Sequence, residues 1–161
     1  MERGCARMSR NWKLHHVGLP VADLDQAADF FHSLGIGEVS DEFIFDSDSK
    51  EDHEVFGKPT RMNCRVRFVK IGGIPVELIQ PLEGESVHKD FLEEHGDGIN
   101  HIAFVVDDLD EERKILEEQG YPVVVSARHK GAEGGLAYFD TRERFGDLFL
   151  ELLENPQNSA D

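Results

Sequence analysis

The sequence contains an internal duplication. Residues 14–39 align with residues 99–124 without a gap, so that His101 follows its counterpart His16 by 85 positions. This offset, about half the chain, is too long for a stacked repeat array, whose units have roughly 20–50 residues. We therefore expect one structural module that occurs twice, with equivalent residues at equivalent places in the two copies.

Both copies predict a strand followed by a helix. Residues 16–21 and 101–106 are short apolar runs rich in branched side chains, which is typical of strands. The sequence Asp-Leu-Asp follows each run, and an aspartate there can cap the first free backbone N–H groups of a helix. In the first copy, residues at helical spacing give one apolar face, formed by Leu24, Ala27, Ala28, Phe31 and Leu34.

Three further strands are predicted in each copy, because short apolar runs bounded by turn residues recur after each helix. They are expected at 43–45, 66–71 and 74–80 in the first copy and at 122–125, 136–140 and 147–153 in the second. The predicted fold class is α+β, with two tandem βαβββ modules.

The expected organisation is a single domain between two short terminal segments. A charged stretch at 46–61 has almost no core residues and predicts a mobile surface loop, and a short helix is expected at 87–95. From the N-terminus, the predicted parts are a disordered segment at 1–12, module 1 at about 13–81, a connector at 82–98, module 2 at about 99–154 and a frayed polar tail at 155–161.

The duplication singles out four polar residues. His16 and His101 occupy the same position in the first strand of each copy, and Glu77 and Glu151 occupy the same position in the last strand. A carboxylate inside an apolar strand is costly to bury unless it is paired or bound to a metal. Pseudo-twofold symmetry would bring these residues together as a His₂Glu₂ set, which suits one divalent transition metal ion such as Zn, Ni or Co.

Taken singly, these residues have simpler interpretations. A glutamate in a strand more often faces solvent, and a histidine in a strand is more often a hydrogen-bonded structural residue. Their occurrence as two matched pairs favours the metal site. His15 is expected on the opposite face of its strand from His16. The other histidines are expected to be solvated on helix surfaces or loops, and they are His32, His53, His88, His95 and His129.

The composition excludes several functions. With 33 acidic and 17 basic residues, the formal net charge is −16, which disfavours binding to nucleic acid or to anionic membranes. The two cysteines form no disulfide framework. Neither a signal peptide nor a membrane-spanning run of roughly 18 apolar residues is visible. This cysteine usage fits a reducing cytoplasm best, so a cytoplasmic protein is expected.

With these motifs, the sequence resembles the vicinal oxygen chelate superfamily of glyoxalases, bleomycin resistance proteins and dioxygenases. The resemblance rests on His-Val-Gly at 16–18 and Gly-Ile-Asn-His-Ile-Ala-Phe at 98–104, each followed by Asp-Leu-Asp, and it spans about 13–154. It implies paired βαβββ modules whose strands form a curved mixed sheet around a metal-binding cleft, and it implies a homodimer. The four metal ligands that it implies are His16, Glu77, His101 and Glu151.

Within the superfamily, the connector is similar to that of methylmalonyl-CoA epimerase, because a Pro-Leu-x-x-x-Ser turn at 81–86 and a short helix lead into the second module. This similarity implies proton abstraction next to the carbonyl of a thioester, through a metal-stabilised enediolate, with Glu151 as the base and Glu77 as the second candidate. The sequence departs from some epimerases at 64–68, where it has no acid. Two alternatives stay open: a glyoxalase I-like lyase acting on a thiol adduct, and a non-catalytic antibiotic-binding module.

A coenzyme A ester would need cations for its phosphate groups. The basic candidates are Arg65, Arg67, Lys70 and the loop at 128–130. The simpler interpretation of each is a solvated strand edge or loop.

Overall fold

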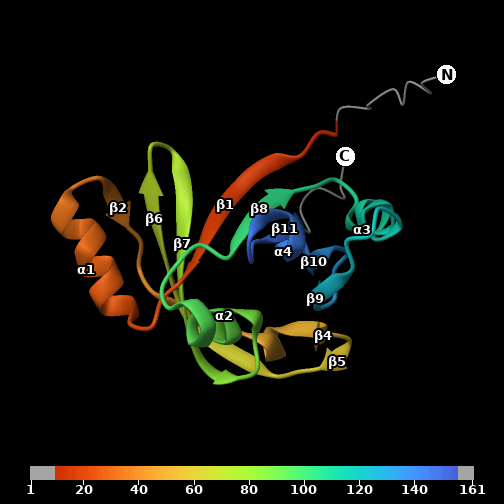
Figure 1. Ribbon diagram of the computed structural model, residues 1–161, viewed down its shortest axis with the longest axis horizontal. Coiled ribbons are helices and arrows are strands. Elements are labelled where there is room, and N and C mark those ends of the chain that lie inside the picture. The colour runs from red at the N-terminus through yellow and green to blue at the C-terminus, as the bar shows by residue number, and fades with distance from the viewer. Residues whose placement is uncertain (1–9, 156–161) are drawn as a thin grey trace.

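The computed structural model describes residues 10–155, in which eleven strands form one mixed sheet and helices pack against it (Figure 1). Most of the predicted segment 1–12 and the tail beyond residue 155 lie outside the described residues. No helix within residues 10–155 is both long and apolar enough to cross a membrane. In chain order the elements are β1 (Lys13–Pro20), α1 (Leu24–Leu34), β2 (Gly37–Val39), β3 (Phe43–Asp46), η1 (Ser47–Ser49), β4 (Lys50–Val55), β5 (Lys58–Pro59), β6 (Met62–Ile71), β7 (Ile74–Gly84), α2 (Val87–His95), β8 (His101–Val105), α3 (Leu109–Glu118), β9 (Val123–His129), β10 (Gly135–Phe139), α4 (Arg142–Phe145) and β11 (Phe149–Glu154).

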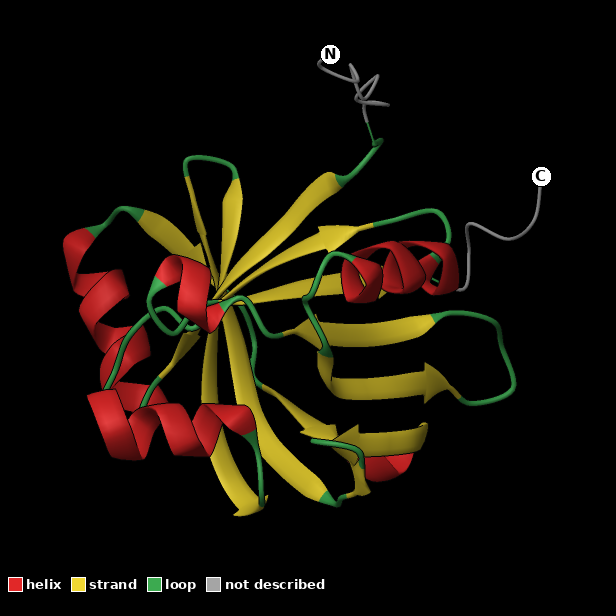
Figure 2. Ribbon diagram, turned by 45° about the vertical axis from the view of Figure 1, so that its right-hand side comes forward, coloured by secondary structure: helices red, strands yellow, loops and turns green. Residues whose placement is uncertain are grey.

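The sheet consists of two equivalent halves. The strands β1 and β8, the first of each module, pair antiparallel at its centre. On its other side β1 has β7 as a parallel neighbour, and β8 has β11 in the same way. The strands β6 and β10 follow outward on the two sides, and Figure 2 shows how strongly the sheet curves. The predicted α+β fold with two βαβββ modules in a curved mixed sheet is thereby confirmed.

The helices α1 and α3 are equivalent in the two modules. Asp23 and Asp108 cap them as predicted, because the Oδ1 atom of each accepts a hydrogen bond from a backbone N–H group, at 3.0 and 2.9 Å. Leu24 and Leu109 open the two helices and are 0% and 2% exposed. They pack on the sheet in two separate apolar clusters, one in each module.

The charged stretch at 46–61 is ordered, so the prediction of a mobile loop there was wrong. It contains η1, β4 and β5, and β4 pairs antiparallel with β9. The preceding strand β3 pairs with β6, so the chain passes from the outer side of module 1 to that of module 2 through the three residues of η1. Backbone pairing with β9 orders this stretch, and such hydrogen bonds do not require apolar side chains.

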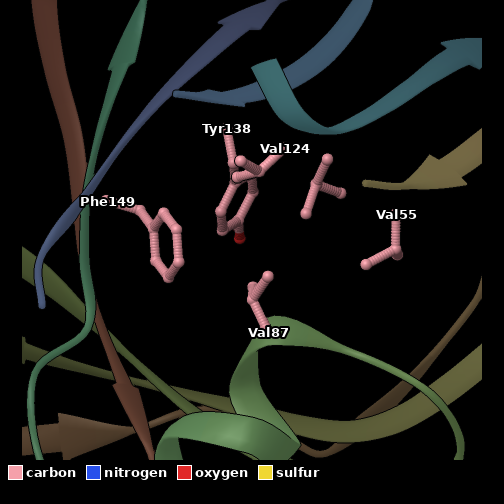
Figure 3. Close-up of a cluster of buried hydrophobic side chains, with 6 residues drawn as sticks. Val55, Val87, Val124, Tyr138 and Phe149 are labelled. Atoms are coloured by element: carbon pink, nitrogen blue, oxygen red, sulfur yellow. The ribbon is translucent and has the colours of Figure 1, made fainter. Parts of the chain in front are cut away.

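One apolar cluster fixes β4 against the remaining structure (Figure 3). Val55 on β4 packs against Val87 in the first turn of α2 and against residues of β9, β10 and β11. Figure 3 shows the ring of Tyr138 directed from β10 toward the start of α2. Several of these residues also line a partly open cavity, namely Val55, Val87, Val125 and Tyr138. The strand β4 is therefore part of the cavity wall.

Removal of either leucine at the start of a helix should destabilise the protein. Leu24→Ala and Leu109→Ala each leave a void in a fully buried cluster, and such changes lower the free energy of unfolding by roughly 2–5 kcal/mol. Denaturant unfolding monitored by circular dichroism measures the effect. The control is Leu82→Ala, because Leu82 is 46% exposed. A loss at Leu24 and Leu109 no greater than that at Leu82 would contradict the assigned cores.

Candidate metal centre

Four side chains from the four central strands meet at one point. His16 lies on β1, His101 on β8, Glu77 on β7 and Glu151 on β11. The Nε2 atoms of the two histidines are 3.1 Å apart. The Oε2 atom of Glu77 lies 3.3 and 3.2 Å from the Nε2 atoms of His16 and His101, and that of Glu151 lies 3.3 and 3.4 Å from them. The fold thus brings together the four residues that the sequence singled out.

The register of the central strands produces this convergence. Gly18 pairs with His101 on one side and Glu77 on the other, and Ala103 pairs with His16 and Glu151 in the same way. Each histidine therefore lies opposite a small residue of the other module. A Cβ atom on Gly18 would lie 1.7 Å from the Cε1 atom of His101. Position 18 must consequently be glycine for the His101 ring to occupy its place.

The four side chains are buried and electrostatically coupled. Those of His16 and Glu151 are each 5% exposed, that of His101 is 0% and that of Glu77 is 14% exposed. Burial by itself would lower the pKa of His16, but the carboxylates of Glu151 and Glu77 outweigh it and raise this pKa to about 10. Burial would raise the pKa of Glu77, but His101 and His16 hold it well below its usual range. Both pKa shifts have the same cause, because the charged forms of His16 and Glu77 are stabilised by the neighbouring side chains of the cluster.

A second layer of buried polar side chains fixes the His101 ring. The Oδ1 atom of Asn100 lies 2.6 Å from the Nδ1 atom of His101, and its Nδ2 atom lies 3.0 Å from the Nδ1 atom of His88. Because an amide nitrogen only donates, His88 accepts, and Asn100 presents its oxygen to His101. The His101 ring then donates from Nδ1, which leaves the lone pair of Nε2 directed at the other three side chains.

His88 is thus a buried site residue, and the prediction that it is solvated was wrong. It is 5% exposed. Burial, with the nearby His101, lowers its pKa to about 3, so the ring is neutral. The duplication gave no signal for His88, because the connector that carries α2 has no counterpart in the other module.

His15 also faces the site, although strand alternation predicted that it would point away. The pairing of β1 with β8 shifts register between Leu14 and His16, and a β-bulge of this kind leaves one residue without a partner. The Nδ1 atom of His15 lies 2.7 Å from the Nδ1 atom of His16, and its ring lines the cavity. Alternation fails at a bulge, which explains the wrong prediction.

His16, Glu77 and Glu151 line a partly open cavity of about 280 Å³, whereas His101 is fully buried beside them and does not reach its wall. Its wall is mainly apolar and includes Phe45, Met62, Val66, Phe68, Leu136 and Leu153. His53 and His129 also line it and are half-buried, so the prediction that both are solvated was wrong. His32 and His95 are exposed, as predicted.

Of the basic candidates proposed from the sequence, His129 in the loop at 128–130 lines the cavity, whereas Arg65, Arg67 and Lys70 do not. The guanidinium of Arg65 is held by Asp25 and Glu42, at 3.0 and 2.7 Å, and neither Arg67 nor Lys70 lines the cavity. The lysine that does line it is Lys50. Lys50 was not among the basic candidates, because the charged stretch that carries it was expected to be a mobile loop.

The donor set fits a divalent metal ion. His16, His101 and Glu151 offer ligand atoms that all lie within 4.8 Å of one another, and Glu77 reaches the same two nitrogens. The Oε2 atom of Glu151 is buried and makes no directed hydrogen bond, although both histidines are near. A cation among these side chains would satisfy that oxygen, and imidazole nitrogen with carboxylate oxygen is a usual ligand combination for transition metals.

Several known proteins are similar to this chain in sequence or in fold. The chain is 31% identical over 144 residues to an uncharacterised protein, YqjC, of Bacillus subtilis strain 168, and the match covers 88% of this chain and 91% of YqjC. It is 32% identical over 145 residues to an ethylmalonyl-CoA/methylmalonyl-CoA epimerase of Cereibacter sphaeroides, covering 87% of this chain and 96% of the epimerase. The crystal structure of methylmalonyl-CoA epimerase from Mycobacterium tuberculosis matches with a TM-score of 0.65 at 27% identity, over 92% of both chains.

A family-level comparison agrees with these matches. The sequence model described as Glyoxalase/Bleomycin resistance protein/Dioxygenase superfamily matches residues 15–139. This range holds α1, α3 and most of the central sheet, including His16, Glu77 and His101. The protein therefore belongs to the glyoxalase/bleomycin resistance protein/dioxygenase superfamily.

Proposed function

We propose that the protein is a divalent-metal-dependent epimerase for an acyl-CoA thioester of the methylmalonyl-CoA kind, which removes and returns the proton next to the carbonyl. The observation that carries this proposal is the convergence of two histidines and two glutamates beside a cavity, which His16, Glu77 and Glu151 line. The similarity to the epimerases of Cereibacter sphaeroides and Mycobacterium tuberculosis supports the choice of substrate class.

In this proposal four residues hold one divalent ion, Zn, Ni or Co: His16, Glu77, His101 and Glu151. When bound, the ion supplies a Lewis acid for the substrate oxygen atoms. The contact between Asn100 and the Nδ1 atom of His101 keeps Nε2 of that ring available as a ligand. His15 contacts Nδ1 of His16 in the corresponding way.

Glu151 is the proposed base, with Glu77 as the second candidate. The resemblance implies a metal-bound but displaceable glutamate at position 151, and the Oε2 atom of Glu151 makes no directed hydrogen bond that proton uptake would break. The strands β7 and β11 flank the β1–β8 pair on opposite sides, so the two carboxylates would reach a substrate from different directions. Epimerisation needs such an arrangement, because the proton leaves one face of the carbon and returns to the other. Within the described residues, no other acidic side chain lines the cavity.

Two other ionisable groups in the cavity wall are poor candidates for the base. Burial, assisted by the charge of Glu77, raises the pKa of the Cys64 thiol to about 12. Burial also raises the pKa of Tyr138 well above its usual value. Both groups are therefore protonated near neutral pH, and we assign them to the wall of the cavity.

A glyoxalase I-like lyase that acts on a thiol adduct is the second candidate. It is favoured by the presence of all four donors, the His/Glu/His/Glu set that the resemblance implies for bacterial glyoxalase I. In that reaction the proton returns to the neighbouring carbon, which a single carboxylate can accomplish. An antibiotic-binding module is less well supported, because it has no need for two carboxylates in a buried cluster.

Gly18→Ala should weaken divalent-metal binding while leaving the fold intact. The added methyl group would occupy the space of the His101 ring. The ring must therefore move, and its Nε2 atom would leave the position beside the other three side chains. We expect a loss in affinity for Co or Zn of roughly tenfold or more, measured by calorimetry with circular dichroism to check the fold. Gly98→Ala is the matched control, since a methyl group there would meet only the Phe91 ring at 3.4 Å. Equal affinity in the two variants would show that His101 is not a ligand.

The metal-loaded protein should exchange the α-proton of methylmalonyl-CoA for deuterium in ²H₂O, as measured by mass spectrometry. Glu151→Gln preserves the size of the side chain but removes the proton acceptor, so exchange should fall by about 100-fold or more. Glu38→Gln changes an exposed glutamate on the edge strand β2 that does not line the cavity and should leave the rate unchanged.

The same preparation distinguishes the alternatives. No exchange by the metal-loaded wild type would refute the epimerase proposal. Turnover of a methylglyoxal–thiol adduct would then favour the lyase, and tight antibiotic binding with neither reaction would favour the binding module.

A further inference from the structure

The cavity has a second polar end, away from the metal centre. Lys50 on β4 and His129 on β9 are cross-strand partners, and both line the cavity. Lys50 also borders a surface groove lined by Asp48, Arg61 and Lys130, among others. This end of the cavity therefore lies next to the outside of the molecule.

The strand register gives the separation between the two ends. Glu151 of the metal centre pairs with Tyr138, which pairs with Val125, so these three residues form one row across the sheet. His129 lies four positions beyond Val125 on β9. At about 3.3 Å per residue, this places it about 13 Å along the strand from that row. Leu136 and Leu153, which pair with each other and line the cavity, form an apolar band between the two ends.

Lys50 brings a positive charge to this end without an acidic partner. Its Nζ atom lies 3.1 Å from the Nδ1 atom of His129, whose Nε2 atom lies 2.9 Å from the backbone oxygen of Glu154. The ring thus donates from Nε2 and accepts from Lys50 at Nδ1. No carboxylate in the described residues forms an ion pair with Lys50, whereas Arg61 and Arg128 are paired with Asp48 and Asp110. One of the three ammonium donors is used by His129, which leaves two for a ligand.

We infer that Lys50 and His129 form an anion subsite, which binds a phosphate or carboxylate group at the end of the substrate remote from the metal centre. His129 orients the ammonium group, and the ammonium group contacts the anion. A small keto acid is too short to occupy both ends of the cavity. The arrangement selects a substrate with a reactive carbonyl, an apolar or neutral middle part and a distant anionic group.

The identity of the anion rests on the proposed function. In an acyl-CoA thioester, the remote anion is a phosphate at the end of the pantetheine arm. In a glutathione adduct, which the second candidate function would use, it is a peptide carboxylate. Both present the anionic oxygens that a lysine binds.

Calorimetry with three probes tests the inference on metal-loaded protein. The probes are acetyl-CoA, S-acetylpantetheine, which has the same arm without phosphates, and S-hexylglutathione. Lys50→Met keeps the length of the side chain and removes its charge. It should weaken acetyl-CoA binding about tenfold or more, equivalent to about 1.4 kcal/mol, and leave S-acetylpantetheine binding unchanged. Lys58→Met is the matched control, because Lys58 is an exposed lysine on the neighbouring strand β5 and lines no part of the cavity.

The outcomes separate this inference from the proposed function. A selective loss of acetyl-CoA binding in Lys50→Met supports a phosphate subsite. A selective loss of S-hexylglutathione binding supports the anion subsite with a carboxylate and, with no deuterium exchange, counts against the epimerase. Equal loss for all three probes, no loss for either anionic probe, or no binding of either by the wild type would overturn the inference.

Discussion

Two carboxylates and two imidazoles packed together inside a sheet are the constraint on which this structure depends. An unpaired buried charge costs several kcal/mol, so neither Glu77 nor Glu151 could occupy its strand without a nearby cation. The four side chains come from four different strands, and only one register of these strands brings them together. The antiparallel pairing of β1 with β8 sets that register, and the absence of a side chain at Gly18 makes room for the His101 ring.

The duplicated and the non-duplicated parts of the chain contribute different things. The duplication supplies the four central side chains and the two helices that support the sheet. The connector helix α2 and the strand β4 occur only once. The helix α2 places His88 against Asn100, and Asn100 in turn fixes the orientation of the His101 ring. The strand β4 places Lys50 at the end of the cavity remote from these residues. The four candidate metal ligands are therefore related by approximate twofold symmetry, whereas the cavity beside them has none.

The sequence predicted most of the fold and the four central residues, because duplication makes equivalent positions visible and apolar periodicity marks the strands. It failed where the structure departs from local patterns. The β-bulge at His15 breaks strand alternation, so this residue faces the site. The side chains of β4 are mostly charged, so the apolar pattern of the sequence could not indicate that its backbone pairs with β9. His88 lies in an unrepeated helix, and Arg65 is neutralised by Asp25 and Glu42, which are distant in sequence. Long-range pairing of this kind is visible only in three dimensions.

The claim at the centre of this account is that His16, Glu77, His101 and Glu151 hold one divalent ion. Anomalous X-ray diffraction from crystals grown with Co or Zn tests it most directly. The account predicts a single strong peak among these four side chains, within about 2.3 Å of both Nε2 atoms and of carboxylate oxygen, and no such peak in the Glu77→Ala/Glu151→Ala variant. A protein that crystallises in the presence of the ion with no peak there, or with the ion bound only to other residues, would contradict it.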